Sequence, residues 1–253
     1  MEAIFLHFDR GFDFFLSSVH GDKTIRLAPN RRASIKDIIE SFGVPHTEVG
    51  KILVNGVEVD FSNIPRNSEI ITICSISTPF DITRKTRLRP HPFDTIRFVA
   101  DVNVGKLAKL LLMLGFDTEY SNGFSDDTVA EIAFRNKRVV LTRDTSLLKR
   151  KKVTFAKRIR QERPESQLKE VLEYFGLDKG PFEFLSRCTT CNKKLQPIKK
   201  QTIVHRLEPK TRKYYDTFKI CPGCCRIFWQ GSHYEDMKNR FANDFLKPQH
   251  SAT

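Results

Sequence analysis

Short apolar runs and one segment with the hydrophobic periodicity of a helix lie within about the first 45 residues of the chain. Residues 2–8 alternate like a strand, and the run at 24–27 can pair with them across a turn-rich stretch at 17–23. Between 34 and 43, apolar residues recur at helical spacing, after a serine suited to cap a helix and before a glycine suited to end one. This pattern predicts a hairpin followed by a helix.

A second hairpin and a last strand complete this first unit. Residues 51–59 form two alternating arms around Asn55-Gly56, a dipeptide that accepts the positive φ angles of a tight turn. The run at 69–74 supplies one more strand. The order of these elements describes a ubiquitin-like β-grasp domain of the α+β class, which we place at residues 1–80.

A proline-rich stretch separates this unit from the rest of the chain. Residues 78–92 contain three prolines and four basic residues and show no hydrophobic periodicity. Such a composition is typical of a linker. We therefore predict a linker at 81–92 and a domain boundary there.

Strands alternate with amphipathic helices after the linker. Apolar runs of the buried-strand kind lie at 96–100, 116–120, 138–142 and 153–159, and helical patterns lie at 103–114, from 125 onward, and at 164–175. Alternating strands and helices imply a doubly wound parallel sheet of the α/β class. We predict this domain at residues 93–186, followed by a C-terminal segment at 187–253.

Positive charge is concentrated in the last two thirds of the sequence. The chain has 43 lysines and arginines against 30 acidic residues, a net charge of +13. Residues 1–80 hold 8 basic and 10 acidic residues, so the excess belongs to the remainder. A polyanion such as nucleic acid fits this field, because bound phosphates release counterions. A solvated basic surface without a partner is the alternative.

No stretch approaches the roughly 18 apolar residues that a membrane span requires, and the N-terminus alternates like a strand and lacks the pattern of a secretory signal. We therefore expect a cytoplasmic protein with no membrane partner.

Aspartates follow the predicted parallel strands at the positions where ligand sites form. Asp101 and Asp144 come just past strand ends, and Asp126 and Asp127 open the helix between them. Crowded carboxylates repel one another unless a cation neutralises them, and Mg²⁺ or Mn²⁺ prefers such oxygen ligands. A water activated by this metal would attack a phosphodiester. Asp126 and Asp127 lie about 100° apart on a helix, so we expect one of them to reach the centre, and we prefer Asp126, with Asp127 as the alternative.

Two alternatives compete with this metal site. The aspartates can instead cap helices and face solvent, which is a common use of this residue. Phosphatases that form an aspartyl-phosphate also begin with a strand that ends in Asp, but those enzymes have the motif Asp-x-Asp at that point. Here the residue two positions after Asp101 is Asn103.

Together these segments carry a resemblance. FVADVNVGKLAKLLLMLGFDTEY followed by SDDTVAEIAFRNKRVVLTRD resembles the PIN-like ribonuclease domain first described at the C-terminus of the mut-seven exonuclease. The resemblance implies metal-dependent cleavage of RNA, with Asp101, Asp126 and Asp144 at the family's acidic positions. PIN domains carry a further acid, for which Asp117, Glu119 and Glu131 are weak candidates. A module that binds RNA without cutting it is the alternative function.

Five of the six cysteines lie within residues 188–225. Cys188 and Cys191 form one CxxC pair, and Cys221 and Cys224 form another, so that four thiolates can close a tetrahedral structural zinc site. Buried free thiols or a redox pair are the alternatives. Between the pairs, residues 201–208 and 212–220 are expected to form the arms of a hairpin in a zinc ribbon. The segment CPGCCRIFWQGSHYEDM resembles the ribbon that follows the mut-seven-type nuclease core.

Nine basic and two acidic residues lie between 143 and 163. Aromatic residues are interspersed among the charges of this segment and of the ribbon, a mixture suited to single-stranded RNA. The front domain resembles the ubiquitin-like domain found ahead of this nuclease in bacterial proteins, and we expect it to offer a surface for a protein partner. The prediction is an endoribonuclease.

Overall fold

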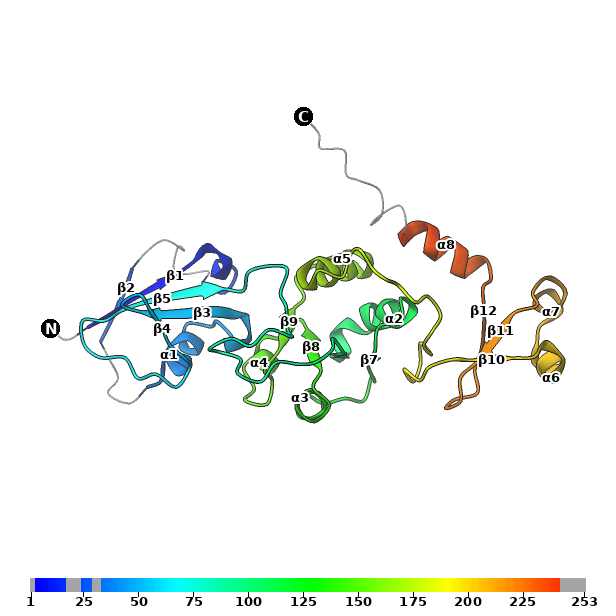
Figure 1. Ribbon diagram of the computed structural model, residues 1–253, viewed down its shortest axis with the longest axis horizontal. Coiled ribbons are helices and arrows are strands. Elements are labelled where there is room, and N and C mark those ends of the chain that lie inside the picture. The colour runs from blue at the N-terminus through cyan, green and yellow to red at the C-terminus, as the bar shows by residue number, and fades with distance from the viewer. Residues whose placement is uncertain (1–2, 17–23, 29–32, 242–253) are drawn as a thin grey trace, which may run out of the picture.

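The structure is a computed structural model of the 253-residue chain, and it describes residues 3–16, 24–28 and 33–241. Three units follow one another along the long axis: a mixed sheet with one helix, a parallel sheet covered by helices, and a small ribbon (Figure 1). The turn predicted at 17–23 lies outside the described residues. Within the described part, no helix has the length and apolar character needed to span a bilayer.

The N-terminal unit is a five-stranded sheet in the order β2-β1-β5-β3-β4, in which β1 and β5 run parallel. This arrangement confirms the predicted β-grasp fold. Helix α1 packs on it, and two short 3-10 helices, η1 and η2, precede β2 and β3. The bounds are β1 Ile4–Phe8, η1 Arg10–Phe12, β2 Ile25–Leu27, α1 Ile35–Ser41, η2 His46–Glu48, β3 Val49–Val54, β4 Val57–Glu58 and β5 Ile70–Ser75.

Local sequence signals explain where these elements begin and turn. Ser34 accepts a hydrogen bond from the backbone of Asp37, whose carboxylate accepts one in return, so α1 starts with a capping box. Between β3 and β4, Asn55 and Gly56 have φ angles of 49° and 83°, as the tight hairpin requires. Both signals were readable in the sequence.

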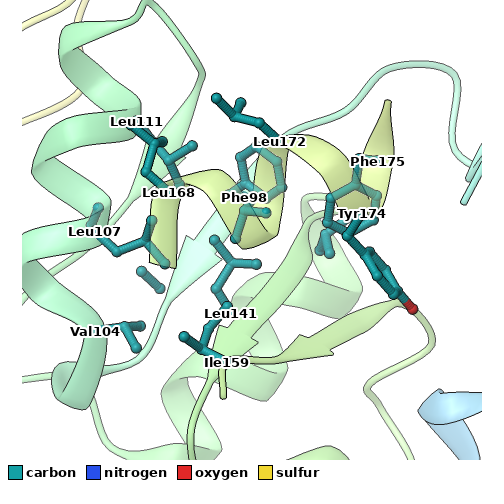
Figure 2. Close-up of a cluster of buried hydrophobic side chains, with 14 of the residues drawn as sticks. Phe98, Val104, Leu107, Leu111, Leu141, Ile159, Leu168, Leu172, Tyr174 and Phe175 are labelled. Atoms are coloured by element: carbon teal, nitrogen blue, oxygen red, sulfur yellow. The ribbon is translucent and has the colours of Figure 1, made fainter. Parts of the chain in front are cut away.

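The central unit is a four-stranded parallel sheet in the order β7-β6-β8-β9. Helices α2 and α5 cover one face, where Phe98, Leu141 and Leu172 belong to a continuous apolar core (Figure 2). Helices α3 and α4 cover the other face. The bounds are β6 Phe98–Ala100, η3 Val102–Val104, α2 Gly105–Met113, β7 Thr118–Glu119, α3 Asp126–Arg135, β8 Val139–Thr142, α4 Thr145–Leu148, β9 Ala156–Arg158 and α5 Pro164–Phe175.

The C-terminal unit is a three-stranded antiparallel sheet, β10-β11-β12, followed by α8. The hairpin predicted at 201–208 and 212–220 is wrong, because that stretch is largely helical and only its end enters the sheet. Pro209 occupies the first turn of a helix, which its fixed φ favours. The bounds are β10 Gln196–Ile198, α6 Lys200–Ile203, η4 Val204–Arg206, α7 Pro209–Tyr214, β11 Phe218–Ile220, β12 Ile227–Trp229 and α8 Ser232–Phe241.

The N-terminal domain covers the edge strand of the parallel sheet. His46 in η2 pairs with Glu40 through Nδ1 at 2.7 Å and with the carbonyl oxygen of Val153 through Nε2 at 2.8 Å. A Glu48 carboxylate oxygen accepts a hydrogen bond from the backbone N–H of Arg158 at 3.1 Å. An uncovered edge strand would leave such backbone groups open to pairing with another chain. The contact therefore satisfies one backbone N–H of β9 and joins the two domains.

Residues 77–97 contain no helix or strand, but they are packed against both domains. Arg89 is only 2% exposed and donates hydrogen bonds to the carbonyl oxygens of Val49 and Thr47 at 2.8 and 2.9 Å. Its guanidinium also lies 5.2 Å from the ring centroid of Phe80 and 5.6 Å from that of Phe155. Burial lowers the pKa of Arg89 to about 10. The connecting segment therefore packs between the two domains, and Arg89 is its central contact.

The substitution Arg89→Ala is expected to destabilise the protein by about 2–4 kcal/mol, because two buried carbonyl oxygens lose their donors and a cavity remains. Chemical denaturation, followed by far-ultraviolet circular dichroism, measures the change in the free energy of unfolding. Arg87→Ala is the matched control, since Arg87 is exposed two positions away. Equal stability of the two variants would contradict the assigned role of Arg89.

Candidate functional site

Asp101 lies at the carboxyl end of β6 in the middle of the sheet, where it is 3% exposed. Its Oδ1 accepts a hydrogen bond from the backbone N–H of Val102 at 2.6 Å. Its Oδ2 accepts from Asn103 Nδ2 at 2.5 Å and from Thr142 Oγ1 at 2.6 Å. The three donors fix the carboxylate, which has about four lone-pair sites, so that one direction is left for another ligand.

Asp144 follows the neighbouring strand β8, and it is tied to Asp101 through Thr142. The Thr142 hydroxyl donates to Asp101 and accepts from the backbone N–H of Asp144 at 2.9 Å. The Asp144 carboxylate caps α4 by accepting from the backbone N–H of Ser146 at 2.7 Å and from its hydroxyl at 2.8 Å. The two aspartates thus occupy the ends of adjacent parallel strands, and both also serve as helix caps.

The two candidate acids on α3 are paired with an arginine. Arg150, just after α4, binds the carboxylate of Asp127 and lies 3.6 Å from that of Asp126. The side chain of Asp126 is 36% exposed and that of Asp127 is 86% exposed. In this structure the positive charge opposite both acids is therefore a guanidinium.

Among the residues that the structure describes, four cysteines form the one group of three or more metal-ligating side chains gathered within 4.8 Å. Asp101, Asp126 and Asp144 do not form such a group. Asp101 and Asp144 have the chemistry and the placement for a divalent cation at the strand ends. For Asp126 to join them, its carboxylate has to leave the side of Arg150.

The weak candidates for a further acid lie away from this edge. Asp117 precedes β7 at the opposite end of the sheet and binds Arg138 at 2.6 Å and Arg187 at 3.2 Å. Burial raises the pKa of Asp117, but hydrogen bonds from Asn192 and Arg138 and the positive charges of Arg138 and Arg187 outweigh it and lower the pKa. Glu119 also pairs with Arg138. Asp117 thus holds the sheet to the segment at the start of the ribbon, whereas Glu119 is tied within the parallel-sheet domain.

Glu131 lies on the outer surface of α3, where it pairs with Arg135 and with Lys152. It does not face the strand ends that carry Asp101 and Asp144. The structure therefore gives none of the three weak candidates a place beside those aspartates.

A cleft of about 330 Å³ opens beside the strand ends. Asn103, Arg143 and Glu162 line it together with Lys106, Lys109 and Tyr120. Asn103 joins both sides, because its Nδ2 donates to Asp101 and its Oδ1 accepts from the backbone N–H of Arg143 at 3.1 Å. Sequence reasoning used Asn103 only to exclude a phosphatase and did not single out Thr142 or Glu162. For Asn103 and Thr142 the available signal was a polar residue two positions from an aspartate, and no such signal marks Glu162.

The four cysteines bring two turns of the ribbon together. Cys188 Sγ lies 3.5 Å from Cys224 Sγ, and Cys191 Sγ lies 3.3 Å from Cys221 Sγ. The backbone N–H groups of Thr190 and Gly223 each donate to a sulfur at 3.4 Å. Cys225, next to Cys224 in sequence, is exposed and does not belong to the group. Four sulfurs in this arrangement can hold one tetrahedral metal ion.

Hydrogen bonding within the cluster gives the thiols different pKa values. Burial raises the pKa of Cys221, but N–H donors from Cys224 and Gly223 outweigh it and bring the pKa to about 6. For Cys191, burial and the shared contact with Cys221 raise the pKa to about 12. Thiolates this close repel one another, and a divalent cation removes that penalty. The donor set therefore fits Zn²⁺.

The parallel sheet with aspartates at its strand ends, joined to a four-cysteine ribbon, defines a PIN-like domain with an attached zinc ribbon. A family model described as the Mut7-C RNAse domain matches residues 96–241, and one described as Mut7-C ubiquitin matches residues 1–81. The chain belongs to the Mut7-C RNAse domain family and carries the associated ubiquitin-like domain in front. No curated protein and no solved structure matches the chain significantly.

Proposed function

We propose that the protein is a metal-dependent ribonuclease that hydrolyses phosphodiester bonds within single-stranded RNA. The observation that carries this proposal is the pair Asp101 and Asp144 at the ends of adjacent parallel strands, joined through the Thr142 hydroxyl. The two carboxylates lie at the carboxyl ends of β6 and β8, between which the strand order of the sheet reverses. Carboxylates in this position of a parallel sheet are suited to a divalent cation. The RNAse family match and the basic stretch at 143–163 support RNA as the substrate.

Asp101 and Asp144 are the proposed ligands of Mg²⁺ or Mn²⁺, with Asp126 as the third acid and Asp127 as its substitute. Bound there, the metal would activate a water and offset the charge that develops on the phosphate. Asn103 and Thr142 hold the Asp101 carboxylate in one orientation. Arg143, which lines the adjacent cleft, is placed to receive a phosphate of the RNA.

A role in RNA binding without cleavage is the second candidate. The ion pairs of Arg150 with Asp126 and Asp127 favour it, because they compensate the acids of α3 without a metal. In both cases the four cysteines are proposed to hold a structural zinc ion, since the four sulfurs leave no ligand position open.

The two candidates are separated by Asp144→Asn. Asparagine caps a helix as well as aspartate does, so α4 is retained while the metal loses a charged ligand. We expect cleavage of a labelled single-stranded RNA in Mn²⁺ to fall about a hundredfold or more. The wild-type protein without added Mn²⁺ should be comparably inactive.

Asp94→Asn serves as the control, because Asp94 is an exposed acid that precedes β6 at the opposite end of the sheet. It should cut like the wild type. Cutting at the same rate by wild type and Asp144→Asn would indicate a contaminating nuclease and would leave the binding module as the better description.

A further inference from the structure

An exposed aromatic side chain of the ubiquitin-like domain lies against arginines of the nuclease domain. Phe14, shortly after η1, is 50% exposed. The guanidinium carbon of Arg158 lies 4.2 Å from the centroid of its ring, and that of Arg160 lies 5.4 Å away. Phe15 meets the same ring edge-on, with 5.3 Å between centroids. One domain thus supplies the aromatic rings of this cluster and the other supplies its cations.

The cluster lies at the same edge of the sheet as the candidate active site. Arg158 ends β9 and is in register with Thr142, the residue that joins Asp101 to Asp144. Its Nε donates to Thr145 Oγ1 at 3.2 Å, immediately after Asp144. Along the edge the order is therefore Asp101, Asp144, Arg158 and then the aromatic rings of the front domain.

Positive charge is crowded at this end of the edge. Burial lowers the pKa of Arg158, and repulsion from Arg160 and Arg143 lowers it further, against the attraction of Glu48 and Glu170. Like charges held this close are stabilised when a polyanion reaches them.

The carboxylates of the two nearby acids are held by backbone N–H groups and by Lys157. Glu48 accepts from the backbone of Arg158, and Glu170 accepts from the backbone of Arg160 and pairs with Lys157 at 3.1 Å. Within the described ranges, neither Arg158 nor Arg160 forms an ion pair with a carboxylate, so their guanidinium groups can receive phosphates.

We propose that the ubiquitin-like domain forms part of the RNA-binding surface, with a base of single-stranded RNA stacked on Phe14 and its phosphates held by Arg158 and Arg160. A half-exposed ring beside guanidinium groups is the combination that binds single strands, because the ring stacks a base and the cations receive the backbone. The inference rests on the proposed function for the choice of RNA. The front domain then extends the RNA-binding surface, here called the substrate track, beyond β9.

Binding is measured by fluorescence anisotropy with a labelled single-stranded oligoribonucleotide, in buffer without Mg²⁺, Mn²⁺ or chelator. Under these conditions the proposed cleavage is suppressed and metal at the cysteines is not stripped. Phe14→Ala should weaken binding about tenfold, the typical loss for one stacked base. Phe14→Trp should retain the affinity. Phe134→Ala is the matched control, because Phe134 is a phenylalanine of α3 that is also exposed, and it should bind like the wild type.

The contribution of the guanidinium is tested separately. Arg160→Ala should lower the affinity and reduce the slope of log affinity against log salt by about 0.7, the value for one phosphate contact on a single strand. Thermal unfolding of every variant shows whether the fold is kept. Unchanged binding by Phe14→Ala, failure of Phe14→Trp to bind better than Phe14→Ala, or no RNA binding by the wild type would each overturn the proposal.

Cleavage assays on the same variants separate this inference from the proposed function. If Phe14→Ala raises KM and leaves kcat near the wild-type value, both stand. If RNA binding depends on Phe14 but the wild type cuts nothing in Mn²⁺, the surface is supported and the nuclease proposal fails. If the wild type cuts and Phe14→Ala binds equally well, the nuclease proposal stands and the extended track is overturned.

Discussion

Cys221→Ala is expected to abolish metal binding at the four-cysteine cluster and to unfold the C-terminal ribbon. The ribbon's own buried core consists of Ile203, Leu207 and Phe218, which is too small to hold the unit without a further constraint. Apparent binding free energies of structural zinc are about 10–16 kcal/mol in small zinc domains. Loss of one thiolate removes most of that contribution, so the ribbon should become susceptible to protease.

Elemental analysis of the purified protein should give about one zinc per chain for the wild type and almost none for the variant. Cys225→Ala is the control, since Cys225 is adjacent in sequence and exposed but lies outside the group of four. Limited proteolysis should release the region after residue 187 from Cys221→Ala alone. One bound zinc in Cys221→Ala, or none in the wild type, would refute the zinc assignment.

Asp101→Asn is expected to have the largest effect on RNA cleavage, a loss of about a thousandfold. The substitution removes the charge of a proposed metal ligand. It also places an amide N–H where Asp101 accepts hydrogen bonds from Val102, Asn103 and Thr142. One donor then faces another donor, which costs about 1–3 kcal/mol of stability.

The two consequences are separated by comparing Asp101→Asn with Asp144→Asn. Both variants should lose cleavage in Mn²⁺, but only Asp101→Asn should lose stability in thermal unfolding, because the cap at Asp144 tolerates asparagine. Binding of single-stranded RNA without Mg²⁺ or Mn²⁺ should persist in both. If Asp101→Asn retains wild-type cleavage, Asp101 is a structural cap and not a ligand.

The types of the elements could be read from the sequence with few errors. Periodicity placed α5 at its observed bounds, Pro164–Phe175, and capping residues placed the start of α1 and α3. The predicted strands were longer than those observed, since 96–100 reduces to Phe98–Ala100 and 153–159 to Ala156–Arg158. Apolar residues continue past the hydrogen-bonded ladder, and periodicity alone does not show where pairing ends.

The hairpin predicted within the ribbon was wrong for a related reason. Residues 201–208 and 212–220 were predicted as the two arms, but Pro209 starts a helix, and the sheet takes Gln196–Ile198 as the partner of β11. Strand pairing depends on which segments meet in space, and in this structure β11 lies between β10 and β12. A short apolar run does not specify its own partner.

By itself, the sequence determined the local features of this protein: the element types, the two CxxC turns, and the aspartates that follow β6 and β8. Each depends on side chains within a few positions, where periodicity, capping and turn chemistry act. The tertiary structure alone decided the pairing of Arg150 with the acids of α3, the Thr142 link, and the contact of η2 with β9. His46 and Val153 are 107 positions apart, and electrostatic and hydrogen-bond energies depend on distances in space that sequence separation does not encode.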